Sequence, residues 1–268
     1  MTLSADHFEF VRHLLEEHVG MVLEADQEIF VASRLLPVAQ RHGWSSLDPL
    51  MARLRDHNDR LLTQKVIESL VTHETSFFRD PHYFDELTDR VLPRLIARRA
   101  PERRLAIWCA ACSTGQEAYS VAMILRERFA EQLRDWNVEL LATDVSSRAL
   151  EQAQSGRYSD VEVHRGLSDA RLAQHFRREP TGWRIDDRLQ QMVRFHQTNL
   201  TGTWPQLPTL DLVLLRNVLI YMNTTTRQFI LTRMQRALHP EGCLMLGSTE
   251  SANVQNLQIA CVRAGAIP

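Results

Sequence analysis

The sequence predicts an α/β protein in which a parallel sheet, covered by helices on both faces, follows an all-helical N-terminal region. Residues 1–72 show helical periodicity and no strand-like alternation. From Leu105 onward, short apolar runs alternate with helical stretches, which is typical of strand–helix units in a parallel sheet. A stretch beginning near Trp183 has strand propensity but does not fit this alternation, and it indicates a small antiparallel insertion.

Residues 1–72 are expected to form a helical domain. The first helix is indicated by apolar residues at helical spacing, namely Phe8, Val11, Leu15 and Val19. Gly20 is a suitable stop. A second helix should run over residues 29–36, with Pro37 bending or ending it. A third should start near Ser46 or Asp48 with Pro49 at its first position, and residues 61–70 should form a fourth.

Residues 73–268 are expected to form the second domain. Asp80 and Pro81 resemble an N-cap followed by proline at the first helical position, which predicts a helix to about Arg99. Apolar runs predict strands over residues 105–109, 138–143, 211–215 and 244–246. Helices are expected over 116–131, through Ala149, and over about 225–238.

The antiparallel insertion is expected at about residues 176–200. Two short stretches with strand propensity carry this expectation through five apolar residues, namely Trp183, Ile185, Met192, Val193 and Phe195. They fall between the second and the late parallel strands.

Composition narrows the class of protein. Hydrophobic residues make up 44% and charged residues 24% of 268 residues, as in ordinary soluble globular proteins. No apolar run is long enough to cross a bilayer, and the N-terminus lacks the basic-then-apolar pattern of a secretory signal, so we expect a cytoplasmic protein without membrane insertion. The net charge of −2 gives no global field that would gather nucleic acid.

The four cysteines favour burial over metal binding. Cys109 and Cys112 form a C-x-x-C pair, which suits a redox couple or half of a zinc site. The other half is missing, because Cys243 and Cys261 are far apart in the sequence. Since an apolar run ends at Cys109 and a glycine loop follows Cys112, buried small residues near a turn are the better interpretation. We therefore expect no metal site.

A ligand site is indicated by the turn at residues 110–115 (Ala-Ala-Cys-Ser-Thr-Gly), which follows a strand and precedes a helix. Small residues let a ligand approach the backbone, and the helix N-terminus offers free N–H groups. The full G-x-G-x-x-G pattern of a dinucleotide site is absent. Glu117 either complements the helix dipole or faces a cationic ligand. Asp144, which ends the second strand, either accepts hydrogen bonds from ribose hydroxyls or caps the next helix.

Five segments, occurring in order, resemble the chemotaxis receptor glutamate O-methyltransferases, the CheR family. They are residues 75–79 (Thr-Ser-Phe-Phe-Arg), 112–120 (Cys-Ser-Thr-Gly-Gln-Glu-Ala-Tyr-Ser), 142–144 (Ala-Thr-Asp), 216–221 (Arg-Asn-Val-Leu-Ile-Tyr) and 242–250. The resemblance covers nearly the whole chain, from the helical N-terminus to Glu250.

The resemblance implies a Rossmann-like methyltransferase domain that carries a small β-subdomain and is preceded by an all-α domain. The implied activity is esterification of chemoreceptor glutamates, for adaptation in chemotaxis signalling, with S-adenosylmethionine as methyl donor and S-adenosylhomocysteine as product. The sulfonium and ammonium groups of the donor suit an acidic residue beside the turn. The implied cofactor-binding residues are His73, Thr75, Arg79, Glu117, Asp144, Asn199, Leu200, Asn217 and Val218.

Two residues are candidates for catalysis. Arg79 can grip a carboxylate with two parallel hydrogen bonds, and its alternative is a structural ion pair with Asp80 or Asp85. Tyr221 can hydrogen-bond the acceptor carboxylate or wall the methyl group, and its alternative is packing. An ionised glutamate needs no general base, which agrees with the absence of an obvious Ser–His–Asp or Cys–His set.

The sequence departs from the family pattern at several positions. His73 stands where asparagine is common, Gln116 and Ala118 replace a commoner Glu and Pro, and Met222 replaces a commoner Phe. Some family members hold a receptor C-terminal pentapeptide with a glycine-bracketed loop in the β-subdomain. Residues 178–182 (Arg-Glu-Pro-Thr-Gly) lack that pattern, which predicts that the pentapeptide tether is absent. The tail after Glu250 is short, so the last strands are expected to be incomplete.

The expected partners are the acidic helices of chemoreceptors. By resemblance, they would dock on the basic side chains Arg53, Arg55, Arg60 and Lys65, although a solvated helical face is the plainer interpretation. Two other functions compete: a methyltransferase for another acceptor, and a non-catalytic scaffold that binds the cofactor or a receptor. Enzymes that methylate nucleic-acid amines carry an Asp/Asn-Pro-Pro-aromatic run after the fourth strand, and residues 216–221 contain no proline.

Overall fold

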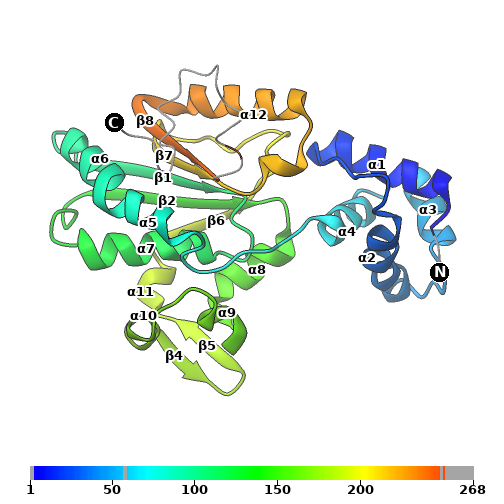
Figure 1. Cartoon of the computed structure of the whole chain (residues 1–268), viewed down its shortest axis with the longest axis horizontal. Coiled ribbons are helices and arrows are strands. Elements are labelled where there is room, and N and C mark those ends of the chain that lie inside the picture. The colour runs from blue at the N-terminus through cyan, green and yellow to red at the C-terminus, as the bar shows by residue number, and fades with distance from the viewer. Residues whose placement is uncertain (1–2, 57–58, 248–249, 251–268) are drawn as a thin grey trace. The chain divides into compact units, whose positions relative to one another are not determined.

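The computed structural model (Figure 1) describes residues 3–56, 59–247 and 250. The chain divides into two compact units. The first unit comprises Met1–Thr72 and Tyr221–Gln228, and the second comprises His73–Ile220 and Phe229–Pro268. No helix within the described ranges is long and apolar enough to cross a membrane.

The N-terminal unit is built from α1 (Ala5–Val19), α2 (Glu28–Arg41), α3 (Asp48–Arg55) and α4 (Arg60–Leu70). The Ser4 side chain caps α1 by accepting a hydrogen bond from the His7 N–H, and Gly20 ends it in the left-handed conformation at φ 71°. The predicted helices are confirmed, with one refinement. Pro37 does not end α2, which continues to Arg41.

A distant segment, Tyr221–Gln228, joins this N-terminal unit. The Val22 N–H donates to the Tyr221 carbonyl at 2.8 Å, and the Asn223 side-chain amide donates to Glu16 at 2.7 Å. A Cβ on Gly20 would lie 2.4 Å from Thr226 Cγ2, so glycine is required for close approach as well as for its backbone angle. No local sequence pattern indicated this association, because it joins residues about 200 positions apart.

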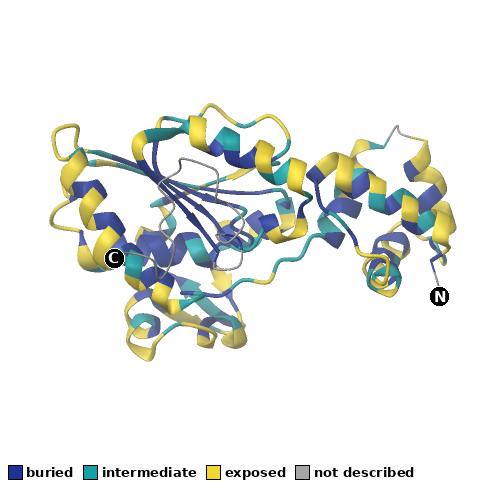
Figure 2. Ribbon diagram, turned by 45° about the horizontal axis from the view of Figure 1, so that its top comes forward, coloured by how far each residue is buried: buried dark blue, intermediate teal, exposed yellow. Residues whose placement is uncertain are grey.

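The second unit is centred on a parallel sheet, and the described residues give the strand order β6-β2-β1-β7-β8. The strands are β1 (Arg104–Ala110), β2 (Asn137–Asp144), β6 (Val193–Gln197), β7 (Leu210–Leu215) and β8 (Leu238–Leu246). β7 is buried along its whole length and β1 from Leu105 onward, as Figure 2 shows for the centre of the sheet. Such continuous apolar runs are expected where helices cover both faces.

Helices flank this sheet on both faces. α7 (Gln116–Arg128) and α8 (Ser147–Ser155) pack against β2 and β6. Residues 229–237 of α12 (Thr224–Ala237) lie on the opposite side, and α6 (Leu92–Arg99) packs against β1. The single helix expected from Pro81 to Arg99 is interrupted: α5 (Pro81–Glu86) passes through a π-helical turn, η1 (Leu87–Val91), into α6.

The small antiparallel sheet is confirmed, but only the first of the two predicted strand stretches belongs to it. Its strand order is β3-β5-β4, drawn from β3 (Arg157–Tyr158), β4 (Phe176–Glu179) and β5 (Gly182–Ile185). Val193 and Phe195, which we assigned to the insertion, belong to β6 and pair in parallel with β2. Strand propensity reports a half-buried pleated environment and not which sheet provides it, so the two stretches could not be told apart.

Three short helices complete this β-subdomain and its connections. They are α9 (Asp160–His164), α10 (Asp169–His175) and α11 (Asp187–Gln190). Residues 178–182, the loop that lacks the glycine-bracketed pattern, form the β4–β5 hairpin. The expectation about the tail after Glu250 lies outside the described residues.

Candidate functional site

The carboxyl ends of the central strands bring most of the predicted site residues together. Ala110 at the end of β1 pairs with Thr143 of β2 and with Leu215 of β7. The chain adds β2 and then β6 on one side of β1, and β7 and then β8 on the other. Ligands of open α/β sheets bind where the strand order reverses in this way.

The turn after β1 is held in a conformation that few side chains adopt. Ala111, Ser113 and Gly115 have positive φ values of 58°, 51° and 92°. A Cβ on Gly115 would lie 2.8 Å from the Cβ of Ala153, so only glycine fits there. Non-glycine residues in the left-handed region are uncommon and persist only when their surroundings enforce them.

Asp144 enforces this turn from the end of β2. One carboxylate oxygen accepts the Ser113 N–H at 2.7 Å and the other accepts the Ser146 N–H at 2.9 Å. The helix N-cap is Ser146 and not Asp144, because the Ser146 hydroxyl accepts the Ala149 N–H. Burial raises the pKa of Asp144, against the two amide hydrogen bonds and the nearby His73. The side chain is therefore a buried acceptor with capacity for a further donor.

Glu117 lies at the start of α7, two residues after Gly115 of the turn that follows β1. Its side chain is 13% exposed and accepts a hydrogen bond from Arg216 at 3.0 Å. Burial raises the pKa of Glu117, and Arg216 opposes this rise. Strongly perturbed carboxyl groups beside a ligand-binding edge are typical of functional sites. The structure thus places two buried carboxylates, Glu117 and Asp144, on either side of the turn after β1.

Arg79 belongs to a segment, residues 73–80, that packs on this same turn. The Ser113 hydroxyl donates to the His73 carbonyl at 3.1 Å, and the Phe78 N–H donates to the Ser120 hydroxyl at 3.0 Å. The Arg79 guanidinium donates to the Glu74 carbonyl at 2.9 Å. No carboxylate pairs with it in the part of the chain that the structure describes, and Asp80 pairs with Arg216 instead.

That pairing corrects two expectations about this segment. The structural ion pair between Arg79 and Asp80 or Asp85 is not formed. Asp80 precedes α5 at the N-cap position, yet its side chain makes no capping hydrogen bond, because its carboxylate is directed to Arg216 and its own φ is 60°. Arg79 therefore keeps most of its donors for a ligand. Thr75 lies half-buried in the same segment.

Asn199 and Leu200 follow β6 beside the end of β2. The Thr198 N–H donates to the Asp144 carbonyl at 2.9 Å, which fixes this turn to the strand. The Asn199 side-chain oxygen accepts from the amide and the hydroxyl of Thr201, and Leu200 is buried. The structure therefore brings both residues to the same edge of the sheet as Asp144.

Asn217 and Val218 follow β7 and are fixed by a carboxylate that sequence reasoning did not assign. Glu250, 3% exposed, accepts hydrogen bonds from four backbone amides, those of Asn217, Val218, Leu219 and Gly247, at 2.7–2.9 Å. Asn217 has a positive φ of 57°, so this anchor stabilises an uncommon backbone conformation. The available signal was the place of Glu250 at the end of the family-like segment 242–250.

Tyr221 is the one predicted site residue that is grouped with the first compact unit. It ends the short helix η2 (Leu219–Tyr221) and is grouped with the N-terminal unit, where its carbonyl accepts the Val22 N–H. Its side chain is 36% exposed. These contacts support neither of the two roles expected for the Tyr221 side chain, which were catalysis and packing.

Arg216 is a second residue that sequence reasoning did not assign. Its side chain is 2% exposed and donates to Glu117 at 3.0 Å, to Asp80 at 2.6 Å and to the Arg79 carbonyl at 2.8 Å. The guanidinium carbon also lies 3.8 Å from the centre of the Tyr83 ring. The signal was its place directly before Asn217 in the segment 216–221.

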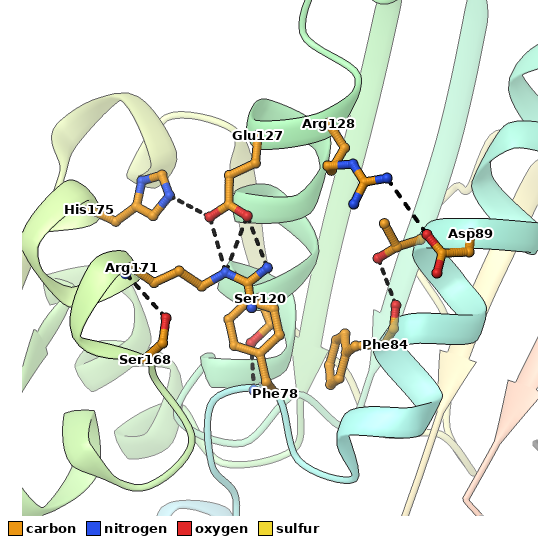
Figure 3. A network of polar contacts seen from close by, with 10 residues as sticks. Phe78, Phe84, Asp89, Ser120, Glu127, Arg128, Ser168, Arg171 and His175 are labelled. Carbon is orange, nitrogen blue, oxygen red and sulfur yellow. Dashed lines mark hydrogen bonds and ion pairs between the residues drawn. The ribbon is translucent and has the colours of Figure 1, made fainter.

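A polar cluster links the site segment to the β-subdomain (Figure 3). Glu127 on α7 binds Arg171 through hydrogen bonds of 2.9–3.2 Å and His175 through one of 2.8 Å. The guanidinium of Arg171 covers the ring of Phe78 at 3.9 Å. Because Phe78 precedes Arg79, this cluster supports one side of the site segment.

Sulfur chemistry is not indicated. Cys109, Cys112 and Cys243 are buried and form no disulfide bond among the described residues, and burial raises the pKa of both Cys109 and Cys112 far above its ordinary value. A buried, protonated thiol is inert, which confirms that these residues act as small packing groups. No group of three potential metal ligands occurs among the residues that could be searched.

In comparisons with known proteins, two family models match consecutive stretches of the chain. Residues 6–71 match the model of the CheR methyltransferase all-alpha domain, and residues 73–265 match that of the CheR methyltransferase SAM binding domain. Chemotaxis protein methyltransferase 1 of Pseudomonas aeruginosa is 36% identical over 256 residues, which are 94% of this chain and 93% of that protein.

Two other relatives match over similar lengths. Chemotaxis protein methyltransferase Cher2 of Pseudomonas putida is 35% identical over 92% of this chain and 90% of that protein. The chemotaxis protein methyltransferase of Escherichia coli is 33% identical over 94% of this chain and 86% of its own length.

Proposed function

The chain belongs to the CheR methyltransferase family, and from this premise we propose that it esterifies glutamate side chains of chemoreceptors with methyl groups from S-adenosylmethionine. The observation that carries this proposal is the pair of buried carboxylates, Glu117 and Asp144, beside the turn after β1. We place the reaction in the cytoplasm, where the signalling ends of chemoreceptors lie.

The residues at the strand ends fit the chemistry of this methyl donor. Burial disfavours the ionised form of both Glu117 and Asp144. A cation or a hydroxyl donor bound beside either carboxylate would offset this effect by stabilising the ionised form. Glu117 suits the positive groups of the donor, and Asp144 suits its ribose hydroxyls. Arg79, which has no ion pair within the described residues, suits a carboxylate.

The remaining assigned residues would complete the binding site. His73 and Thr75 lie in the segment that packs on the turn after β1, and Asn199 with Leu200 lies beside Asp144. Asn217 and Val218 present a turn that Glu250 holds in place. We propose that these side chains and backbone groups enclose the adenosine part of the donor, because they flank Asp144 and the end of β7.

The chain's own contribution to the reaction is alignment and exclusion of water. When bound, S-adenosylmethionine supplies a methyl group on a positively charged sulfur, which an ionised carboxylate can take by direct displacement. A glutamate is ionised at neutral pH, with an ordinary pKa of about 4.3, so no general base is required. Arg79 would hold either the acceptor carboxylate or that of the donor, and Tyr221 would contact the acceptor.

Docking of an acidic receptor helix would use the N-terminal unit. Arg55 is paired with Asp6 at 2.6 Å and Arg53 lies 3.6 Å from Asp59, so both are partly neutralised. Arg60 and Lys65 of α4 are exposed and pair with none of the residues that the structure describes. We therefore propose that α4 carries more of the receptor contact than α3.

The pentapeptide tether remains proposed as absent. The β4–β5 hairpin at residues 178–182 carries Pro180 and Thr181 where a glycine-bracketed loop would be needed. Arg178 is engaged by Asp160 and Trp183 lies within hydrogen-bonding distance of the same carboxylate. Two polar side chains of the hairpin thus contact Asp160 of α9, which leaves fewer hydrogen-bonding groups for a peptide.

One experiment separates this function from its alternatives. The protein is incubated with membranes bearing chemoreceptors and methyl-labelled S-adenosylmethionine, and the label released by mild alkali is measured. Alkali-labile label on the receptor is expected for a methyl ester. Alkali-stable label would indicate another acceptor group, and no label on well-folded protein that still binds the donor would indicate a scaffold.

A further inference from the structure

Arg216 connects three parts of the proposed site through one guanidinium. One terminal nitrogen donates to Glu117 at the start of α7. The other donates to the backbone carbonyl of Arg79 and to the carboxylate of Asp80. These contacts lie 99 to 137 positions away from Arg216 in the sequence, so they impose long-range order on the site.

The backbone around Arg79 needs such support. Phe78 and Asp80, on either side of it, both have positive φ values, 48° and 60°. Such a conformation is uncommon outside glycine and is retained only where its surroundings enforce it. Ser120 and Arg171 hold Phe78, while Arg216 holds the carbonyl of Arg79 and the side chain of Asp80. Arg79 is therefore fixed from both sides.

Charge gives a second reason for the position of Arg216. It is a nearly fully buried cation between two carboxylates, and it is stacked on the ring of Tyr83. Without this cation, the carboxylate of Glu117 would be a buried, uncompensated charge. Lysine could replace the charge but not the planar fork that reaches three acceptors at once.

Given the proposed function, we infer that Arg216 is a positioning residue, which compensates the buried charge of Glu117 beside the cationic methyl donor and holds the backbone of Arg79 in place. It acts through Glu117 and through the backbone of Arg79. The charge sustains donor binding, and the fork geometry sustains turnover. These two roles can be separated by substitution.

The role in binding is tested by the dissociation constant of S-adenosylmethionine, measured by calorimetry on the full chain for wild type, Arg216→Met and Arg216→Lys. Burial raises the pKa of Glu117 and Arg216 opposes this, so Arg216→Met should raise the pKa of Glu117 further. The other groups that face Glu117 are Arg79, Tyr83, Cys109, Cys112 and Glu250. Of these, only Arg79 would still favour the ionised form.

The expected signature is a pH-dependent loss of binding. The ratio of the Arg216→Met dissociation constant to the wild-type constant should be about tenfold or more at the acid end of a pH series over which both proteins stay folded, and it should fall as the pH rises, because a higher pH favours the ionised form of Glu117. Using the ratio removes the titration of the donor itself. Arg216→Lys should show a ratio that is nearly independent of pH, but its turnover should fall about tenfold or more through lost alignment. A ratio for Arg216→Met that is flat across this range would overturn the inference.

A second variant covers the case in which Arg216→Met does not fold. Asp80→Asn removes the charge of one partner of Arg216 and weakens its charge-assisted hydrogen bond, and asparagine tolerates the positive φ of this position. Methyl transfer by Asp80→Asn should fall about tenfold, with donor affinity within about twofold of wild type. The matched control is Asp85→Asn, on the exposed side of α5, which should keep full activity. Equal activity of the two variants would contradict the role of Arg216.

The result for the wild-type protein distinguishes a failure of this inference from a failure of the proposed function. If wild type neither binds the donor nor methylates a receptor, the proposed function fails. If wild type does both and the Arg216 and Asp80 variants match it, only the positioning role fails.

Discussion

At the scale of single residues, the site depends on groups that fix other groups. Asp144 holds the turn after β1 through Ser113, and Glu250 holds the turn after β7 through four backbone amides. Two of the three parallel-strand turns at the site are therefore held by buried acids.

Arg79 is the residue for which the expected effect is largest. Arg79→Ala should remove most methyl transfer, on the order of a 100-fold loss, while the chain stays folded, because its side chain makes one hydrogen bond to a backbone carbonyl within the described residues. Labelled methyl transfer and thermal unfolding should be measured together. Arg94→Ala, at an exposed position on α6, is the matched control. Wild-type turnover of Arg79→Ala would remove Arg79 from the site.

Local chemistry predicted the site residues to different extents. Glu117 and Asp144 could be identified from their places after strands, and their burial agrees with that assignment. Arg216 and Glu250 could not be assigned roles, because their partners lie about 30 to 140 positions away. Contacts of Ser146 and Asp80 exclude the N-cap alternative for Asp144 and the ion pair between Arg79 and Asp80, and such contacts do not appear in a local pattern.

At the scale of elements, the polar cluster of Glu127, Arg171 and His175 joins α7 to α10. The hydrogen bonds from Arg171 and His175 lower the pKa of Glu127 against the opposing effect of burial. A carboxylate with a lowered folded-state pKa stabilises the fold above its ordinary pKa, here 4.5, and loses that contribution as the pH falls through the folded-state value. The link between helix and β-subdomain should therefore weaken in acid.

Glu127→Gln tests this link. The variant should be less stable than wild type by about 1–2 kcal/mol near neutral pH, and the difference should shrink as the pH is lowered below the ordinary value of 4.5. Denaturant unfolding at a series of pH values gives the comparison. Glu131→Gln serves as a control, because Glu131 is paired with Arg134 on an exposed surface. A stability difference that does not change with pH would show that the charge of Glu127 is not what matters.

The same scale shows where sequence periodicity was sufficient and where it was not. The buried strands β1 and β7 were evident as continuous apolar runs, and the end of α1 at Gly20 was predicted correctly. Val193 and Phe195 were assigned to the wrong sheet, because their partner strand, β2, is about 50 positions away. The interruption at η1 had a local signal that we did not use, because Pro93 lacks an N–H group to donate to the carbonyl four residues before it.

At the scale of the whole molecule, the two compact units are not two consecutive stretches of the chain. Tyr221–Gln228 follows the site strand β7 along the chain but is grouped with the N-terminal helices. Met21 and Met222 form an antiparallel bridge within that unit. Sequence analysis ended the helical domain at residue 72 and had no means of including this segment.

The proposed docking of the receptor on α4 can be tested by reversing the charge of this helix. The double variant Arg60→Glu and Lys65→Glu should raise the apparent KM for receptor by about tenfold, because it repels acidic helices, and should leave the affinity for S-adenosylmethionine unchanged. Arg41→Glu at the end of α2 is a single-charge control on the same unit. An unchanged KM would exclude α4 as the receptor contact.

The central claim is that the ends of β1, β2 and β7 form a site for S-adenosylmethionine and its product. Titration calorimetry with S-adenosylhomocysteine measures this directly on the wild-type chain. We predict one binding event per chain, weakened about tenfold or more by Asp144→Asn and unaffected by Asp85→Asn. The absence of any heat of binding on well-folded protein, across a range of temperatures, would contradict the account.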